Sequence, residues 1–134
     1  MPEPITGRCL CGSIRYACGP LLYPPTLCHC QSCRRASGAH ALGWLTVTAM
    51  SLRYTQGQPV EFESSRGRHR TFCGHCGSPL TYRSGARPAE IDVTLGTLDQ
   101  PGSLAPVDHI WMEDAPGWDQ PSDGLPRYAR GRHA

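Results

Sequence analysis

The 134-residue sequence has no long apolar run. No stretch approaches the roughly 20 apolar residues that a membrane-spanning helix needs, so we do not expect a membrane protein. The first residues, MPEPITGRCL, also lack the basic-then-apolar order of a secretory signal. We therefore expect a cytoplasmic protein. In that reducing compartment, cysteines stay as thiols or bind metal rather than pairing as disulfides.

The sequence also lacks a strong excess of charge of either sign. Lysine and arginine number 13 together and aspartate and glutamate number 11, which gives a net charge of +2. Proteins that bind nucleic acid usually carry a clear basic excess, because they must neutralise phosphates. The composition therefore gives no support to a nucleic-acid partner.

No segment shows a convincing helical repeat of apolar residues. Glycine supplies 15 residues and proline 13, and short β-branched and aromatic runs lie between them. This pattern is typical of a mainly β domain. The expected strands are Ser13–Ala17, Ala41–Thr46, Ser51–Tyr54, Val60–Ser64, His69–Cys73, Pro79–Tyr82, Glu90–Thr94 and His109–Met112.

The length suits one domain, which we place at residues 1–128, and we expect residues 129–134 to form a flexible tail. From Asp114 onward the sequence is irregular and rich in proline. The segment around Gly67 predicts a hairpin with its tip at Ser65 to Arg68, where glycine can adopt a positive φ. We expect the hairpin's arginines, Arg66 to Arg70, to be solvated rather than to bind an anion.

Seven of the eight cysteines fall into three tight groups. A CxxC spacing directs both sulfurs toward one point, about 2.3 Å from each when the point is a zinc ion. Zn²⁺ is therefore the leading candidate for a cofactor. The groups are Cys9-Leu10-Cys11, Cys28-His29-Cys30-Gln31-Ser32-Cys33 and Cys73-Gly74-His75-Cys76.

The number of thiols indicates two different metal sites. Seven thiolates cannot fill two four-coordinate sites, but four plus three fits one closed site and one site with an open position. Closed zinc sites are usually structural, and open ones catalytic. Spacing alone leaves the partition open: Cys9 and Cys11 could close with Cys73 and Cys76, or with Cys28 and Cys30.

Five segments carry a resemblance to a known family. They are GRCLCGSIRY (Gly7 to Tyr16), CHCQSCRRASGA (Cys28 to Ala39), TFCGHCGSPLTY (Thr71 to Tyr82), HIWMEDAPGW (His109 to Trp118) and LPRY (Leu125 to Tyr128). Together they resemble the glutathione-dependent formaldehyde-activating enzyme family, which is related to the centromere protein V group. The resemblance covers nearly the whole chain.

The resemblance implies a β-tent fold, in which antiparallel sheets carry zinc-binding knuckles at their strand ends. It implies a carbon-sulfur lyase of the S-(hydroxymethyl)glutathione synthase type, whose partners are a glutathione-like thiol and an aldehyde such as formaldehyde. Cys18 lies outside the family's metal motifs, and we interpret it as a small buried or half-buried thiol. The implied ligands are Cys9, Cys11, Cys73 and Cys76 for a structural zinc and Cys28, Cys30 and Cys33 for a catalytic one.

The open site suggests how such an enzyme would work. A thiol bound beside three thiolates loses its proton and can attack formaldehyde. We prefer this hypothesis to one in which zinc acts as a Lewis acid on the carbonyl group, because three anionic ligands reduce the Lewis acidity of the metal. His29 matches the family's histidine, and we expect it beside the catalytic metal rather than bound to it. Arg34 matches the family's arginine and could hold a glutathione carboxylate.

Two other hypotheses stay open at this point. The chain could be a zinc-stabilised binding module for chromatin or a protein partner, without catalysis. It could also be a purely structural two-zinc protein in which a histidine closes the three-cysteine site. His40 and His109 are interpreted as structural histidines, and nothing in the sequence indicates the oligomeric state.

Overall fold

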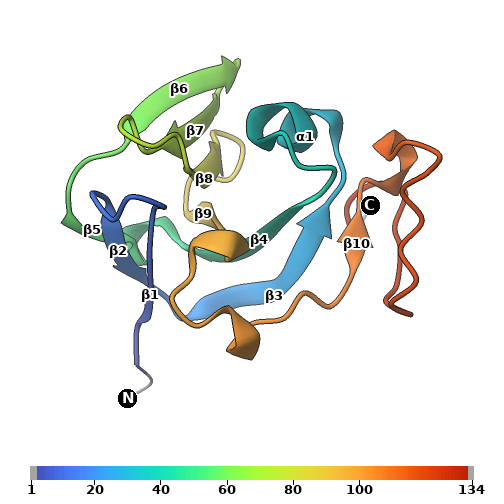
Figure 1. Cartoon of the computed structure of the whole chain (residues 1–134), viewed down its shortest axis with the longest axis horizontal. Coiled ribbons are helices and arrows are strands. Elements are labelled where there is room, and N and C mark those ends of the chain that lie inside the picture. Colours follow the sequence, from blue (N-terminus) through green and yellow to red (C-terminus); the bar gives the residue numbers. More distant parts are fainter. Residues whose placement is uncertain (1–2, 133–134) are drawn as a thin grey trace.

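The computed structural model describes residues 3–132. Strands dominate this range, and most of the helical segments are single 3-10 turns (Figure 1). No helix in the described range is both long and apolar enough to cross a membrane. In chain order the elements are β1 (Ile5–Arg8), β2 (Arg15–Cys18), β3 (Leu21–Cys28), α1 (Gln31–Ser37), β4 (Leu42–Thr48), η1 (Ala49–Ser51), β5 (Arg53–Gln56), β6 (Val60–Ser65), β7 (Arg68–Phe72), β8 (Pro79–Ser84), β9 (Glu90–Thr94), η2 (Leu95–Thr97), η3 (Pro101–Ser103), β10 (His109–Ile110) and η4 (Met112–Asp114).

The strands form two sheets. The smaller has the order β1-β2-β5, and the larger has the order β10-β3-β4-β9-β8-β7-β6. Within residues 3–132 the paired strands are antiparallel except β10, which runs parallel to β3. The expectation of a mainly β fold with antiparallel sheets is confirmed.

The main core lies where the central strands of the larger sheet face the smaller one. Leu45 and Val47 of β4, Leu80 of β8 and Val93 of β9 are each at most 1% exposed. Burying an aliphatic side chain of this size contributes about 1.5–3 kcal/mol. A second, smaller cluster forms around Trp44 on the opposite face of β4.

The long strand β3 was not predicted, because Pro24 and Pro25 lie inside it. Proline lacks the N–H that a central strand must donate, and it is tolerated only at edges and bulges. β10 pairs with β3 only at Leu27 and Cys28. Beside the prolines, the Pro25 carbonyl accepts a hydrogen bond from the Val107 N–H at 3.0 Å, a contact that needs no N–H from proline. The pairing of β3 with β4 also shifts register between Tyr23 and Thr26.

The helix α1 was missed as well, since its seven residues are too few to show an apolar repeat. Local contacts define it instead. Cys30 is the N-cap, and its sulfur accepts a hydrogen bond from the Cys33 backbone N–H at 3.3 Å. Gly38 ends the helix in the left-handed conformation, with φ +76.

The predicted hairpin is confirmed. β6 and β7 pair antiparallel, with Ser65 opposite Arg68. Gly67 in the turn has φ +73, a value at which a Cβ atom would be strained. The turn therefore depends on glycine.

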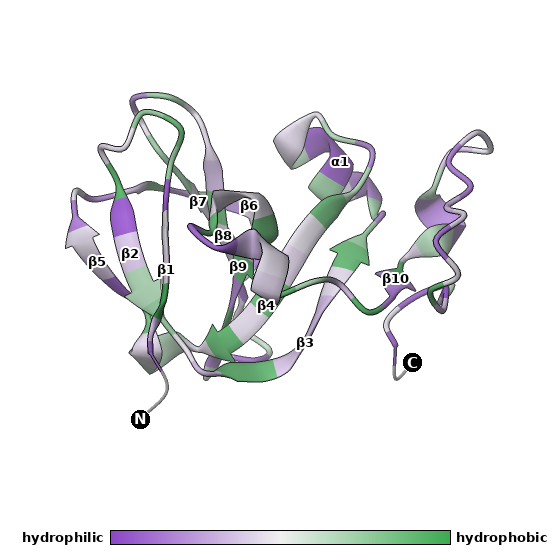
Figure 2. Ribbon diagram, turned by 60° about the horizontal axis from the view of Figure 1, so that its bottom comes forward, coloured by the Kyte–Doolittle hydropathy of each residue, from purple (hydrophilic) through white to green (hydrophobic). Residues whose placement is uncertain are grey.

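The segment that follows β10 is mostly hydrophilic (Figure 2) and is attached by polar contacts. The Trp111 N–H donates to the Arg130 carbonyl at 3.0 Å, and the Glu113 N–H donates to Ala129 at 3.2 Å. The Arg132 guanidinium donates two hydrogen bonds to the buried Asp108 carboxylate, at 2.7 and 2.8 Å. The part of the expected tail that the structure describes, residues 129–132, is thus tied to the domain, and residues 133 and 134 lie outside the described range.

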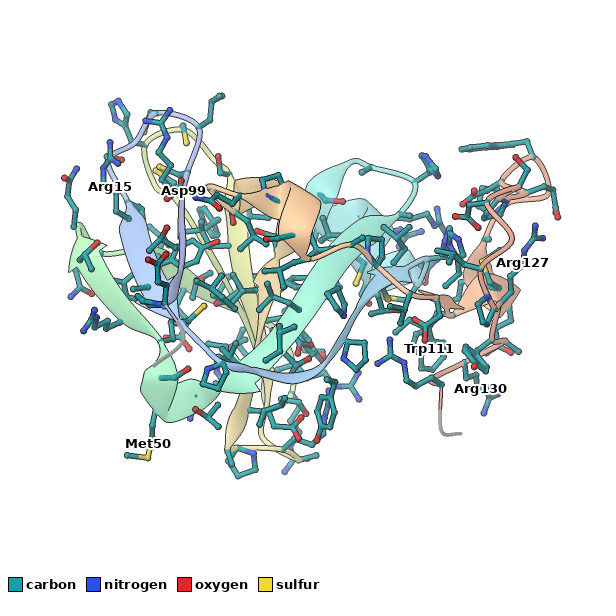
Figure 3. The ribbon with its side chains drawn as sticks, turned by 90° about the horizontal axis from the view of Figure 1, so that it is seen from below. Arg15, Met50, Asp99, Trp111, Arg127 and Arg130 are labelled. Atoms are coloured by element: carbon teal, nitrogen blue, oxygen red, sulfur yellow. The ribbon has the colours of Figure 1, made fainter. Side chains whose placement is uncertain are left out.

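The two arginine pairs near this end offer a test of that attachment. Arg132 and Asp108 are largely buried, whereas Arg130 and Glu113 are exposed (Figure 3 labels Arg130). Because Arg132→Ala leaves a buried carboxylate unpaired, we expect it to lower the free energy of unfolding by about 3 kcal/mol. Arg130→Ala should cost less than about 1 kcal/mol, because water replaces its partner. Urea denaturation at neutral pH measures both.

The effect should also depend on pH in a defined direction. Burial opposes ionisation of Asp108, but the hydrogen bonds from Arg132 and Thr26 outweigh it and lower the pKa of Asp108. The stabilisation is therefore present above the carboxyl group's ordinary pKa and is lost as the pH falls through the lowered value. Equal losses in the two arginine variants would show that the C-terminal residues are not anchored through Asp108.

Candidate metal centres

Four cysteine sulfurs from two distant turns meet at one end of the molecule. They belong to Cys9 and Cys11, between β1 and β2, and to Cys73 and Cys76, between β7 and β8, and all lie within 4.8 Å of one another. The Cys9–Cys11 and Cys11–Cys73 sulfur separations are 3.6 and 3.8 Å. A tetrahedral zinc with bonds of 2.3 Å places its sulfurs roughly 3.8 Å apart. The four thiols suit zinc, and these two separations already match tetrahedral coordination.

Both turns are built to direct backbone N–H groups at these sulfurs. The Ile14 N–H donates to the Cys9 sulfur at 3.3 Å, and the Cys76 N–H donates to the Cys73 sulfur at 3.4 Å. Gly12 and Gly77 follow the second cysteine of each pair, with φ +80 and +81, so each turn requires glycine. Such N–H groups stabilise thiolates, the form that binds metal.

The three remaining clustered cysteines converge at the junction of β3 and α1. Cys28 ends β3, Cys30 caps α1 and Cys33 lies in its first turn. Their sulfurs lie within 4.8 Å of one another, and those of Cys28 and Cys33 are 3.5 Å apart. The hydrogen bonds from Cys28 and Cys33 lower the pKa of Cys30. The same contacts, together with burial, raise the pKa of Cys28, so a cation is needed before all three can be anionic.

Aromatic side chains and one arginine surround this three-cysteine group. Trp44 and Tyr82 pack beside it with their rings 6.2 Å apart. The Arg70 guanidinium lies over the Tyr82 ring, and its Nη2 is 3.9 Å from the Cys33 sulfur. Trp111 also packs here, in a left-handed backbone conformation (φ 59) that is uncommon for residues other than glycine.

A cleft opens between α1 and the β6–β7–β8 strands next to these side chains. Its volume is about 590 Å³, within the range of roughly 300–1,000 Å³ that is usual for small-molecule sites. The residues that matter most for its chemistry are Arg35, Trp44, Phe62, Arg70, Phe72 and Gly77. The cleft thus joins the surroundings of the three-cysteine group to the knuckle that carries Cys76.

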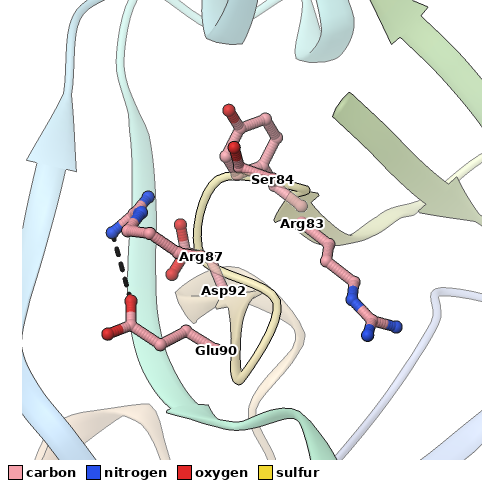
Figure 4. Close-up of a pocket in the computed structure, with 6 residues that line it drawn as sticks. Arg83, Ser84, Arg87, Glu90 and Asp92 are labelled. Atoms are coloured by element: carbon pink, nitrogen blue, oxygen red, sulfur yellow. Dashed lines mark hydrogen bonds and ion pairs between the residues drawn. The ribbon is translucent and has the colours of Figure 1, made fainter. Parts of the chain in front are cut away.

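A second depression, shown in Figure 4, lies at the β8–β9 turn and is a poor candidate for a site. Arg87 and Glu90 face each other across it in an ion pair of 3.2 Å. It encloses no space that would admit a water molecule. The 590 Å³ cleft is therefore the better candidate for a ligand-binding site.

The histidine between Cys28 and Cys30 faces away from the sulfurs. His29 is 1% exposed, and its Nδ1 lies 2.7 Å from the Asp119 carboxylate while its Nε2 lies 2.9 Å from His109 Nδ1. His109 Nε2 in turn meets Asp123 at 2.8 Å, and His40 Nδ1 approaches Asp119 at 3.2 Å. His29, His40 and His109 thus share one polar cluster.

The two arginines after Cys33 point to different places. The Arg34 Nη2 donates to the Asp114 carbonyl at 3.4 Å, and its buried Nε has no hydrogen-bond partner among the described residues. Arg34 is not among the side chains that line the cleft, whereas Arg35 and Arg70 are. The structure therefore favours Arg35 and Arg70 over Arg34 as contacts for a ligand in the cleft.

Several residues of this region were not singled out in the sequence. Arg70 was expected to be a solvated hairpin charge, yet it reaches the Cys33 sulfur. Its position follows from register, because the turn that carries Cys73 and Cys76 pairs Arg70 with Tyr82. The register shifts between Thr71 and Phe72, so regular counting outward from the turn would not have given this pair. Asp119 and Asp123 lie in irregular chain, where no periodic pattern marks them.

Comparisons with known proteins agree with this geometry. A family model described as "Glutathione-dependent formaldehyde-activating enzyme" matches residues 4–114, a range that includes all seven clustered cysteines. No curated protein matches the chain. The crystal structure of a Rhodobacter sphaeroides protein, a Northeast Structural Genomics target, is similar over 91% of this chain and 98% of that one, with a TM-score of 0.61. Its sequence identity is 22%, so this likeness shows the fold alone.

Two buried cysteines of the same core allow the four-cysteine cluster to be tested. Cys73 is 1% exposed and lies in the cluster, while Cys18 is 3% exposed and lies outside it; burial raises the pKa of Cys18 to about 11. A closed zinc site contributes on the order of 10–16 kcal/mol in small zinc domains, so Cys73→Ser should unfold the protein. Cys18→Ser should cost about 1–3 kcal/mol and leave it folded. Circular dichroism and zinc analysis would report both, and equal zinc content in two folded variants would contradict the ligand role of Cys73.

Proposed function

The chain belongs to the glutathione-dependent formaldehyde-activating enzyme family, and from that premise we propose that it is a zinc-dependent carbon-sulfur lyase. The reaction joins glutathione, or a similar thiol, to formaldehyde and gives the S-hydroxymethyl adduct. Cys28, Cys30 and Cys33 hold the catalytic zinc. Cys9, Cys11, Cys73 and Cys76 hold a structural zinc.

The observation that carries the proposal is the position of the three-cysteine group beside the cleft. Arg70 lines the cleft and lies 3.9 Å from the Cys33 sulfur, and Trp44 lines it while packing against Cys28 and Cys33. A molecule in the cleft can therefore approach the group. The four-cysteine cluster has a complete ligand set of its own and needs no such molecule.

Cys28, Cys30 and Cys33 would hold the zinc, which would supply a position where a substrate thiol could lose its proton and stay nucleophilic. The sulfur electron pair then forms the new carbon–sulfur bond, while the carbonyl π pair moves to oxygen. The proton released by the thiol ends on that oxygen, so no other reactant is consumed. The chain's part is to hold the two reactants in contact, which can replace a large share of the entropic barrier.

The cleft has the chemistry to hold the rest of a glutathione molecule. Glutathione is a tripeptide that carries carboxylates, and guanidinium groups bind carboxylates through paired hydrogen bonds. Arg35 and Arg70 line the cleft from opposite sides, α1 and β7, and the Phe62 and Phe72 side chains supply apolar walls. Arg70 is pre-oriented by its contact with Tyr82, so less side-chain freedom is lost on binding.

The same features count against a binding module without catalysis. A net charge of +2 offers little attraction to nucleic acid. Both nitrogens of His29 are engaged by Asp119 and His109, so His29 does not close the three-cysteine group in this arrangement. An open position next to a cleft is the property that a catalytic zinc site requires.

The test replaces one ligand of the catalytic group. Cys33→Ser should lower the rate of exchange between glutathione and its hydroxymethyl adduct by more than about 100-fold. Replacing a residue that only hydrogen-bonds to a metal ligand already costs about 10–100-fold in metal affinity or activity, and Cys33 is a ligand itself. NMR exchange spectroscopy with formaldehyde and glutathione measures this rate, and thermal unfolding checks that the domain remains folded.

Cys18→Ser is the matched control, since it removes a buried thiol outside the metal groups. It should retain the wild-type rate. The same assay with 2-mercaptoethanol, which has no carboxylate, reports whether the cleft arginines recognise the peptide. A wild-type protein loaded with zinc that accelerates neither reaction would refute the proposed function.

A further inference from the structure

The polar cluster behind the three-cysteine group has the composition of a metal site. One ring nitrogen each of His29 and His40 and a carboxylate oxygen of Asp119 lie within 4.8 Å of one another. The three residues come from the β3–α1 connection, the α1–β4 connection and the C-terminal segment. Asp119 lies outside residues 4–114, the range that matches the family model.

The distances are near those of a coordinated ion. Bonds of about 2.0–2.1 Å to a tetrahedral zinc place nitrogen and oxygen ligands roughly 3.3 Å apart. The His40 Nδ1 lies 3.2 Å from the Asp119 oxygen, which already fits. The His29 Nδ1 lies 2.7 Å from the same oxygen, so it would have to move outward by about half an ångström.

With neutral imidazoles the contacts of the cluster are one hydrogen short, and either a proton or a metal ion can supply the missing positive charge. Four contacts join its members: His29 and His40 each meet Asp119, His29 meets His109, and His109 meets Asp123. Each contact needs one hydrogen. Carboxylates supply none, and three neutral imidazoles supply one each, which leaves the cluster one short.

A metal ion at the Asp119 end removes this deficit. It would replace both contacts to the Asp119 carboxylate and leave two contacts, for which the N–H groups of His29 and His109 suffice. His29 Nε2–H then donates to His109 Nδ1, and His109 Nε2–H donates to Asp123. A ligand histidine whose second nitrogen donates to a hydrogen-bonded partner is the usual arrangement around protein-bound metals.

We propose that His29, His40 and Asp119 form a third metal site, which takes a divalent transition-metal ion such as Zn²⁺. Two imidazoles and one carboxylate suit such an ion better than Mg²⁺ or Ca²⁺, which prefer oxygen ligands. His29 and Asp119 are buried, but the His40 side chain is 58% exposed, so an ion can enter from that side. The site would fasten the C-terminal segment to the turn that carries Cys28 and Cys30.

The inference does not depend on the proposed reaction, and it is tested by metal binding. Protein whose two thiolate clusters are filled with Zn²⁺ is titrated with Co²⁺, which sulfur ligands bind less tightly than Zn²⁺. The wild type should take up about one further equivalent, with the visible absorption of Co²⁺ but without the near-ultraviolet charge-transfer band of sulfur ligation.

His40→Ala should weaken this binding by at least about 10–100-fold, because it removes a direct ligand on the exposed side. His69→Ala is the matched control, since His69 is also a partly exposed histidine beside one carboxylate, Glu63, at 3.5 Å. It should bind Co²⁺ as the wild type does. The proposal is overturned if the zinc-filled wild type takes up no Co²⁺, if the absorption shows sulfur ligands, or if His40→Ala binds unchanged.

Discussion

Thiolate sulfurs repel one another, and seven of them stand in two groups whose members are closer than 4.8 Å. The repulsion is relieved only by a cation or by keeping protons on most of the sulfurs. In the three-cysteine group the hydrogen bonds between the sulfurs raise the pKa of Cys28 and lower that of Cys30, an arrangement that favours one thiolate held by protonated neighbours. Two zinc ions would relieve the repulsion in both groups, and much of the rest of the fold follows from where those ions must lie.

The strands serve this requirement at both cysteine groups. The β1–β2 turn of the smaller sheet and the β7–β8 turn of the larger sheet meet at the four-cysteine cluster, which therefore joins the two sheets. At the three-cysteine group β3 ends with Cys28, and α1 begins with Cys30 as its cap. The C-terminal segment is polar, so it is fastened by Asp108, Asp119 and Asp123 rather than by an apolar face.

Tight local spacing was the information that the sequence carried most clearly. The grouping of cysteines and the glycine turn at Gly67 could be predicted, because each depends on a few neighbouring residues. Strand β3 and helix α1 could not, since proline placement and a seven-residue helix are decided by tertiary pairing and capping. The contacts of Arg70 depend on the register between β7 and β8. The partners of His29 lie 80 and 90 positions away along the chain. Such long-range contacts leave no local pattern.

The central claim is that the three-cysteine group keeps one metal position for a substrate thiol. Zinc-edge X-ray absorption of protein with both thiolate clusters filled tests this most directly. Before glutathione is added, we expect an average of about 3.5 sulfur ligands per zinc, because one site has four and the other three. Adding glutathione should raise the average to about 4. A spectrum that does not change with glutathione, or that already shows four sulfurs per zinc without it, would contradict the account.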